Sequence, residues 1–485
     1  MQPTDTIIPL HSYDDTLTNR SVVLECTMRF DDVLDPYKLH SSLEKLLSRP
    51  DWRKLGGRLR LNSHGRLDYH VPESYDEKRP GVAFFHSQFN TEIAKDPVGA
   101  KLPKPTAQPT VLGDPGEIAA ALRAWGAPQT LDDYLDTDIP QLSLHVVSFT
   151  DATILSLSWP HTFLDALGRK AILEAWVAEL EGRHDDVPPL HGVTRDPLLG
   201  LGYRPQEGYV LSNRRLSPLE VILFALLYIW NTFIWARGEE TRIACISASR
   251  VKALHRGALE DIGSKIDDDG KRKPFVSEGD VISGWMTRLA LQHQRNSNKT
   301  VSIMNALGMR SVLANDLLPS THAYVGNAVA GAWAFLSTGD LYSKPLGYVA
   351  SVIRRSIVEQ GTREQVEARA AVDRISHMRR ESTIYGDATM VPLMFSNWSK
   401  AKFFDTNFSA AVVRPGIDPS KRVNKLGRPS YIQPNGIVSK MTTRNSFIIV
   451  GKDAEGNYWV SGTLQRGVWA KVQEAMDAEQ DASRP

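Results

Sequence analysis

The sequence predicts an α/β protein made of two large domains. Two kinds of segment alternate along the chain. In the short segments apolar and polar residues alternate, which is typical of strands, and in the longer segments apolar residues recur at helical spacing. The chain of 485 residues also exceeds one ordinary core, because a domain holds about 150 residues. We therefore expect an N-terminal domain over residues 1–184, a crossover linker rich in Pro, Gly and charge over 185–216, and a C-terminal domain over 217–485.

The N-terminal half alternates between strand and helix patterns. Its successive patterns are a strand at 22–28, a helix at 34–47, a hairpin turning at 63–65, a Pro-rich surface loop at 101–115, a β-hairpin over 142–159 and a helix over 164–180. Pro160 closes the second strand of the later hairpin, so a strand end and a helix start are expected to lie close together there.

The C-terminal half opens with a helix whose start is well marked. Ser217 is the N-cap, Pro218 occupies the first helical position and Glu220 completes a capping box. The apolar run from Val221 to Trp230 is much shorter than the ~20 residues that span a bilayer, so we expect a buried core helix. The later patterns are strands at 243–248 and 301–305, a polar mobile excursion at 257–274, a helix from Ser277, a strand after Asn327, a helix over 345–378 broken at Gly361, and a hairpin turning at 453–456.

The composition argues against several classes of function. Charged residues make up 23% of the chain and apolar residues 42%, as in a soluble globular protein. The formal net charge of +1 gives no long-range attraction to nucleic acid or to an acidic membrane, so neither partner is expected. Cys26 and Cys245 lie far apart, without a neighbouring thiol or histidine cluster, which argues against a disulfide framework and a metal site.

The compartment and the oligomeric state follow from signals that the sequence lacks. The N-terminus has neither a basic patch nor an apolar core, so no signal peptide is expected. Together with the two separate cysteines, this favours a reducing, cytoplasmic setting. Because no heptad repeat, exposed strand signature or unexplained apolar helix stands out, we expect a monomer.

The segment His161–Gly168 is the main candidate for chemistry. It lies where a β-type run ends and a helical run begins, so His161 is expected at a strand end and Asp165 in or just before a helix. Loops held by such a scaffold are where catalytic side chains tend to lie. The pattern H-x-x-x-D is common, however, and His11-Asp15 and His64-Asp68 match it by chance. A catalytic His161 and a well-satisfied structural histidine both fit.

The sequence also suggests roles for two other residues of this segment, Asp165 and Gly168. The carboxylate of Asp165, four residues on, could fold back to the imidazole or be drawn off to another partner. Gly168 would let the backbone pack closely or turn where a side chain would obstruct it.

Several landmarks agree in order and spacing with one family, and the chain resembles the BAHD acyltransferases, more specifically their fungal relatives in secondary metabolism. The segment His161–Gly168 is similar to the family's H-x-x-x-D-G element with two residues inserted before the glycine. The other matches are Gly308–Arg310 for D-G-R, Tyr324–Asn327 for Y-F-G-N, Ser396–Trp398 for T-S-W, and a Leu-rich early helix followed by Gly56–Leu59. The similarity spans nearly the whole chain.

This resemblance implies a chloramphenicol acetyltransferase-like fold, with two similar domains of mixed sheets flanked by helices, joined by the crossover and enclosing a channel. It implies transfer of an acyl group, most simply acetyl, from acyl-CoA to a hydroxyl of an apolar secondary metabolite such as a terpenoid, polyketide or alkaloid. No covalent enzyme intermediate is implied. Acyl-CoA would be a co-substrate and not a permanently bound cofactor, and its partner in the reaction would be a small-molecule alcohol or amine.

The resemblance also implies roles for single residues. His161 would be the general base, which suits a group whose ordinary pKa is near neutral, and Asp165 a structural carboxylate turned away from the imidazole and held by an arginine. Trp398 would donate its indole N–H to the oxyanion, beside Ser396; the alternative is an aromatic side chain packed in the domain interface. The residues matched to acyl-CoA contact are Gly168, Asn327 and Asn397.

One family element is altered. The position of D-F-G-W-G reads Asn407–Ala411, so its aspartate, glycines and tryptophan are absent. In the family that aspartate pairs with the arginine of D-G-R. Here Asn407 would give Arg310 a neutral hydrogen bond, or Asp405 would substitute for the missing carboxylate.

Two other functions remain open. The altered element fits a non-catalytic or repurposed member of the same fold. A condensation-type domain that uses a carrier-bound acyl group is the third alternative. Such domains usually carry two adjacent histidines, whereas Pro160 precedes His161 here and no carrier segment is attached.

Overall fold

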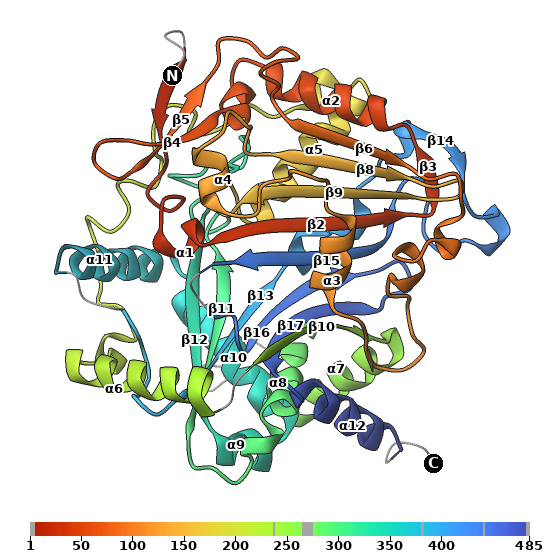
Figure 1. The fold of residues 1–485 in the computed structure, drawn as a ribbon. Coiled ribbons are helices and arrows are strands. Elements are labelled where there is room, and N and C mark those ends of the chain that lie inside the picture. The colour runs from red at the N-terminus through yellow and green to blue at the C-terminus, as the bar shows by residue number, and fades with distance from the viewer. Residues whose placement is uncertain (1–4, 236–237, 264–274, 380–382, 440–441, 482–485) are drawn as a thin grey trace.

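The computed structural model describes residues 5–235, 238–263, 275–379, 383–439 and 442–481, and its element order confirms an α/β protein. Two large mixed sheets lie next to each other, with the N-terminal sheet above the C-terminal sheet in Figure 1 and helices packed on their faces. The expected channel between the two halves stays a prediction.

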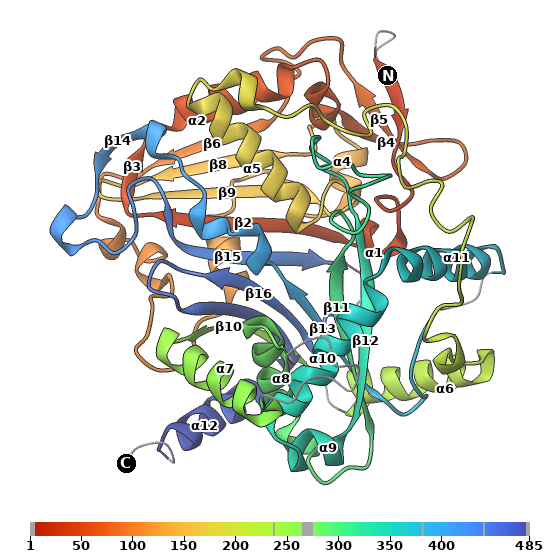
Figure 2. The same cartoon turned by 180° about the vertical axis from the view of Figure 1, so that it is seen from behind.

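The N-terminal sheet has the strand order β15-β2-β9-β8-β6. Its strands are β2 (Val22–Phe30), β6 (Ala83–Gln88), β8 (Ser143–Ser148), β9 (Thr153–Pro160) and β15 (Pro429–Val438), and its helices are α2 (Pro36–Ser48), α3 (Pro115–Leu122), α4 (Leu131–Leu135) and α5 (Ala166–Leu180). All its pairs are antiparallel except β6 with β8. Helices α2 and α5 pack together on one face, and α3 lies over the other (Figures 1 and 2).

The C-terminal sheet has the order β12-β11-β13-β16-β17-β10-β7. Its strands are β7 (Thr110–Val111), β10 (Glu239–Ile246), β11 (Thr300–Gly308), β12 (Val329–Ser337), β13 (Val391–Asn397), β16 (Ser446–Lys452) and β17 (Tyr458–Gln465). Apart from α6, the remaining α-helices of the described chain are α1 (Leu17–Arg20), α7 (Ala248–Ile262), α8 (Glu278–Ala290), α9 (Thr338–Ser343), α10 (Leu346–Gln360), α11 (Arg363–Arg379) and α12 (Val468–Asp481). Helices α7, α8 and α10 pack against one another on one face of the sheet (Figure 2).

The two sheets exchange strands across the expected domain boundary. Strand β15 belongs to the C-terminal half but pairs with β2 along its whole length, from Phe30 opposite Pro429 to Val22 opposite Val438. Strand β7 belongs to the N-terminal half but pairs with β10. The expected domain ranges stay a prediction, but these two strands cross them in both directions.

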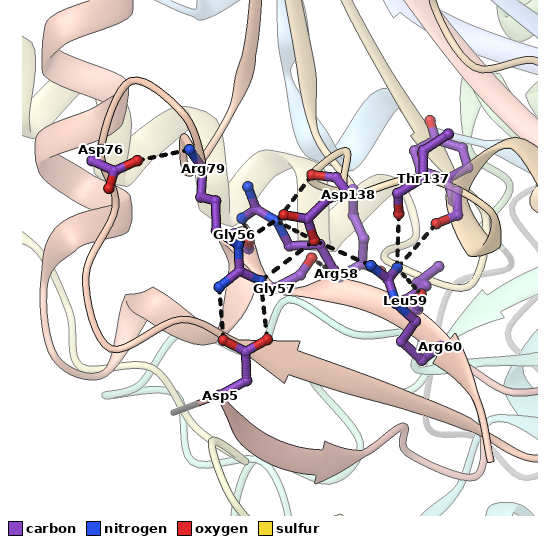
Figure 3. A network of polar contacts seen from close by, with 12 residues as sticks. Asp5, Gly56, Gly57, Arg58, Leu59, Arg60, Asp76, Arg79, Thr137 and Asp138 are labelled. Carbon is purple, nitrogen blue, oxygen red and sulfur yellow. Dashed lines mark hydrogen bonds and ion pairs between the residues drawn. The ribbon is translucent and has the colours of Figure 1, made fainter. Parts of the chain in front are cut away.

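A cluster of charges holds the small sheet of β1 (Thr6–Pro9), β4 (Arg58–Leu61) and β5 (Leu67–Val71) (Figure 3). Asp138, in the loop before β8, forms ion pairs with Arg79 at 2.7 Å, Arg60 at 3.1 Å and the fully buried Arg58 at 3.6 Å. Arg79 also binds Asp5 at 2.8 Å. One carboxylate thereby fixes the small sheet to the N-terminal domain. The pair β3 (Asp32–Leu34) and β14 (Val412–Pro415) forms the other small sheet.

Several sequence-based expectations are confirmed. The hairpin over 142–159 corresponds to β8 and β9, and the helix after it corresponds to α5. The expected break at Gly361 separates α10 from α11. The expected excursion at 257–274 begins as the last turn of α7, and residues 264–274 lie outside the described residues.

The expected burial of the helix after Ser217 is wrong. Helix α6 (Pro218–Ile229) has the predicted capping box between Ser217 and Glu220, but no residue from 217 to 230 is buried. The hydrophobicity of a segment cannot show whether its helix lies in the core or on the surface, because it does not reveal what packs against the helix. Over the described residues, no helix is long and apolar enough to cross a membrane.

Candidate active site

His161 lies in the connection between β9 and α5, and its backbone is fixed on both sides. Its N–H donates to the Val22 carbonyl of β2 at 2.8 Å. Its carbonyl accepts a hydrogen bond from the side-chain amide of Asn327 at 2.9 Å. The histidine therefore stands at the strand end that the sequence predicts, and a segment from the other half of the chain holds it there.

Asp165 is the N-cap of α5, and all its strong hydrogen bonds lead away from the imidazole. Its Oδ1 accepts from the Gly168 N–H at 2.8 Å, which is the usual N-cap bond. Its Oδ2 accepts from the Ala328 N–H at 2.9 Å and from Arg310 Nη1 at 2.8 Å. Of the two arrangements that the sequence leaves open, the structure has the one in which another partner holds the carboxylate.

Arg310 joins this carboxylate to the loop before β12. Its Nε donates to the Tyr324 carbonyl at 3.1 Å and its Nη2 to the Gly326 carbonyl at 2.6 Å. Because the guanidinium is a rigid fork of donors, these bonds fix the positions of all three acceptors relative to one another. The segment matched to D-G-R thus supports the His161 loop directly.

The expected pairing of Arg310 with Asn407 or Asp405 is wrong. Asn407 donates to Glu181 Oε1 at 3.4 Å, and Asp405 forms an ion pair with Arg428 at 2.8 Å. The physical reason is that Asp165, with its side chain only 5% exposed, already satisfies Arg310. A carboxylate introduced at position 407 would face Glu181 and not Arg310.

Gly168 is required by a close approach of two backbones. A Cβ added there would lie 1.9 Å from the carbonyl oxygen of Val325, well inside van der Waals contact. The first turn of α5 can therefore press against the 324–328 segment only because residue 168 has no side chain. The close packing expected from the sequence is present, whereas contact of Gly168 with acyl-CoA stays a prediction.

The imidazole of His161 is half-buried. Its Nδ1 is buried and forms no hydrogen bond to another residue of the described chain. Burial lowers the pKa of His161 below its ordinary value, and the nearby charge of Asp165 opposes that shift only in part. The ring is therefore neutral near pH 7, the state in which it can accept a proton.

Asp14 is a site residue that the sequence did not reveal. Its Oδ1 accepts from the backbone N–H of Asn327 at 2.6 Å and from the Asn327 side-chain amide at 2.9 Å. The same amide nitrogen binds the His161 carbonyl, so Asp14 orients the group that holds the histidine. Burial raises the pKa of Asp14 to about 7. No sequence signal links these residues, because 313 positions separate Asp14 from Asn327.

His11 and Lys54 extend this buried polar group. Lys54 Nζ lies 3.0 Å from His11 Nε2, and His11 Nδ1 lies 3.0 Å from the Tyr324 hydroxyl. Burial lowers the pKa of His11 to about 4 and that of Lys54 to about 8. A neutral His11 that accepts from Lys54 must carry its proton on Nδ1, facing Tyr324. The H-x-x-x-D match at His11, set aside as chance, therefore lies in a supporting layer of the site.

Trp398 and Ser396 form a pair at the end of β13. The indole Nε1–H donates to Ser396 Oγ at 2.9 Å. The Trp398 ring packs against the N-terminal core, with the Arg169 guanidinium 4.8 Å from its centroid and the Phe403 ring 6.0 Å away. This packing agrees with the packed-interface alternative for Trp398, whereas its role at the oxyanion stays a prediction. The indole N–H is bonded to Ser396, whose hydroxyl hydrogen is left to donate.

The residues matched to acyl-CoA contact lie in different environments. Asn327 is 5% exposed, and its amide is committed to His161 and Asp14. Asn397 is exposed and accepts from the Ser399 N–H at 3.0 Å. Within the described ranges, no group of three or more His, Cys, Asp or Glu side chains is arranged to hold a metal ion.

A model of the Transferase family matches residues 127–412. A protein of Penicillium decumbens named transcriptional regulator calD is 47% identical over 480 residues, covering 98% of this chain and 96% of that protein. Acetyltransferase adrJ of Penicillium rubens is 40% identical over 484 residues, covering 97% of this chain and 95% of that protein. Both similarities extend along nearly the full length of the chain.

Solved structures show the same fold at lower identity. The structure of TRI101 from F. graminearum, complexed with coenzyme A and deoxynivalenol, has a TM-score of 0.67 and 14% identity and covers 98% of each chain. Vinorine synthase has a TM-score of 0.57 and 14% identity, covering 99% of this chain and 94% of that one. These neighbours confirm the expected fold class. With its family model and its full-length relatives, the chain belongs to the Transferase family, as a fungal acyltransferase of the BAHD type.

Proposed function

We propose that the protein transfers an acyl group, most simply acetyl, from acyl-CoA to a hydroxyl of an apolar secondary metabolite, with His161 as the general base. The reaction class rests on the family and on relatives named acetyltransferase and O-acyltransferase. Acyl-CoA as the donor is supported by structural neighbours that were crystallised with coenzyme A. It is a substrate of the reaction and is consumed in each turnover.

The chemistry needs one proton acceptor at the oxygen of the acceptor molecule. His161 removes the hydroxyl proton as that oxygen attacks the thioester carbonyl, which forms a C–O bond and a tetrahedral oxyanion. The oxyanion collapses, the C–S bond breaks, and the coenzyme A thiolate takes the proton back from the imidazolium. The products are an ester and a free thiol, and no bond to the enzyme forms.

The observation that carries this role is the separation of Asp165 from the imidazole. A carboxylate bonded to the ring would stabilise the protonated form and raise the pKa of His161. Here Asp165 is committed to Gly168, Ala328 and Arg310, and burial keeps the ring neutral. A neutral histidine fixed at its backbone is poised to accept a proton without first losing one.

Ser396 is the oxyanion donor that this arrangement favours. A donor that is aimed before the reaction begins costs no reorganisation when charge develops. Trp398 holds the Ser396 oxygen through its indole N–H, so the hydroxyl hydrogen of Ser396 is directed elsewhere. In this proposal Trp398 is a positioning residue, and the Ser396 hydroxyl is the donor to the oxyanion.

The test is acyl transfer with a matched pair of histidine variants. The protein is incubated with acetyl-CoA and a panel of hydroxylated terpenoids and polyketides, and free thiol and product mass are measured. Wild type should release thiol together with an acetylated product, and His161→Ala should not. His64→Ala is the control, because His64 also stands in an H-x-x-x-D pattern but lies exposed in a turn, far from the site in sequence.

The outcomes separate the proposal from its alternative. A His161→Ala protein that acylates the panel as fast as wild type would overturn the assignment of the base. The name of the 47% identical relative favours a second candidate, a member of the fold that regulates without catalysis. Equal thiol release by wild type and His161→Ala, without any acylated product, would support that candidate. The net charge of +1 argues against direct binding to nucleic acid in either case.

A further inference from the structure

Helix α6 carries a stripe of large apolar side chains that face solvent. These six residues, called the apolar stripe below, are Leu219, Ile222, Leu223, Leu226, Ile229 and Trp230, with exposed fractions of 79%, 57%, 47%, 61%, 49% and 52%. Their spacing puts them on one side of the helix, because an α-helix turns once in about 3.6 residues. In an ordinary surface helix the apolar side faces the protein core, whereas in α6 the apolar stripe faces solvent.

The opposite side of α6 is apolar as well. Val221, Phe224, Leu227 and Tyr228 are half-buried there. The charged residue of the helix is Glu220, whose carboxylate is held at the N-terminus by Ser217 in the capping box. A helix that is apolar all round belongs in a protein core or in lipid, and α6 lies at the margin of the molecule in both views (Figures 1 and 2).

We propose that the apolar stripe lies in the surface layer of a lipid bilayer, with α6 parallel to the membrane plane. A helix of 12 residues is about 18 Å long, well below the ~30 Å thickness of the hydrocarbon core. It can therefore enter one leaflet without crossing, as interfacial helices do. Trp230 at its end is a residue type enriched at the boundary between water and hydrocarbon.

The surroundings of the stripe fit the same surface. Helix α11 projects from the same side of the molecule as α6 (Figures 1 and 2) and exposes Ile375 at 43% and Met378 at 70%. The exposed charges at the start of α6 are one cation, Arg214, whose guanidinium lies 5.0 Å from the Phe335 ring centroid, and one carboxylate, Glu220. Because these two charges balance, the apolar side chains carry the match to a lipid surface.

The chemistry of the stripe argues against a second copy of the chain as the occupant. Protein interfaces carry about one hydrogen bond per 100–200 Å². Five of the six stripe side chains have no hydrogen-bonding group that could fix the orientation of a protein partner.

Flotation of the full-length protein with vesicles tests the proposal. The vesicles contain phosphatidylcholine alone or with phosphatidylserine, and the variant is Leu219→Gln/Ile222→Gln/Leu226→Gln. Its partition coefficient should fall by about two orders of magnitude, because three buried aliphatic side chains are lost from the lipid. The matched control is Leu17→Gln/Leu61→Gln/Trp125→Gln, whose side chains are exposed at 85%, 54% and 97% outside α6, and it should float like wild type.

Three results would overturn the proposal. Wild type could stay unbound to both kinds of vesicle, or the stripe variant could bind them as wild type does. The third is a wild-type dimer in light scattering that the stripe variant converts to a monomer while neither binds vesicles, which would assign the stripe to a second copy. Flotation needs no acyl donor, so its outcome is independent of the proposed acyl transfer.

Discussion

Asp165 Oδ2 lies 2.8 Å from Arg310 Nη1, although 145 residues separate the two in the chain. This ion pair joins the His161 loop of the N-terminal sheet to the segment that follows β11 in the C-terminal sheet. The arginine that the family pattern places in a remote structural pair therefore acts on the loop that carries His161, the proposed general base. Substitutions of Arg310 should affect activity through the position of His161.

Asp165→Ala should destabilise the protein by about 3 kcal/mol, because it leaves the Arg310 guanidinium partly buried without its charged partner. Asp165→Asn keeps an oxygen for one donor and should cost less. Urea unfolding of both variants measures the difference. If Asp165→Asn abolishes turnover while the unfolding free energy stays at the wild-type value, the carboxylate acts on the imidazole after all.

His161→Ala should lower kcat by about 10²–10⁴, the usual loss for a general base. The free energy of unfolding should change little, since His161 Nδ1 forms no hydrogen bond to another residue in the described structure that would be lost. Steady-state kinetics with acetyl-CoA, together with a melting curve, check both parts. An unfolded His161→Ala protein would show that the imidazole is structural.

Gly168→Ala should be strongly destabilising, because its Cβ would overlap the Val325 carbonyl oxygen at 1.9 Å. Neither partner can yield easily, since both belong to the backbone. Gly257→Ala in α7 is the matched control, as its Cβ would meet nothing within 4 Å, and it should stabilise by up to about 1 kcal/mol. Melting temperatures that fall equally for both variants would contradict the close approach.

The acid limb of kcat/KM should lie below pH 6.5. Burial lowers the pKa of His161 from its ordinary 6.5, so the ring stays neutral as the pH falls through that value and is protonated only at lower pH. The charge of Asp165 opposes this shift, so Asp165→Asn should move the limb to still lower pH. A pH–rate profile with its midpoint at or above 6.5 would show that the imidazole is not desolvated.

Asp14→Asn should make stability less dependent on pH. Burial raises the pKa of Asp14 from 3.8 to about 7, so between these values the folded state holds a proton that the unfolded state has lost. Wild type therefore loses stability as the pH rises through that window. The Asn variant, which keeps the oxygen facing Asn327, should gain stability relative to wild type above pH 7. The melting temperatures of wild type and Asp14→Asn are measured at pH 5 and pH 8. If the difference between the two proteins is the same at both pH values, Asp14 does not titrate in this range.

The local part of the fold was readable from the sequence. Alternation and helical spacing predict β8, β9 and α5, and the capping residues predict the start of α6, because these signals lie within one element. The motif pattern also predicts a carboxylate at position 165 that is held by an arginine. In each case the residues that interact are close in sequence or belong to a known pattern.

The features of the site and of the surface that depend on contacts between residues far apart in sequence could not be predicted. Asp14 and Lys54 join the site through tertiary contacts that leave no local signal. The partner of Arg310 was assigned wrongly, because a pattern names residues but not the distances between them. The exposure of α6 escaped prediction since an apolar sequence does not state which side of the helix is covered.

The strand exchange constrains how the protein can be made. During synthesis β2 is available early, but the neighbour that covers its outer edge, β15, is complete only once residues 429–438 have left the ribosome. An uncovered strand edge is a template for pairing with other chains. The nascent N-terminal half therefore carries an aggregation hazard until late in translation, and a fragment cut in the linker would keep that hazard permanently.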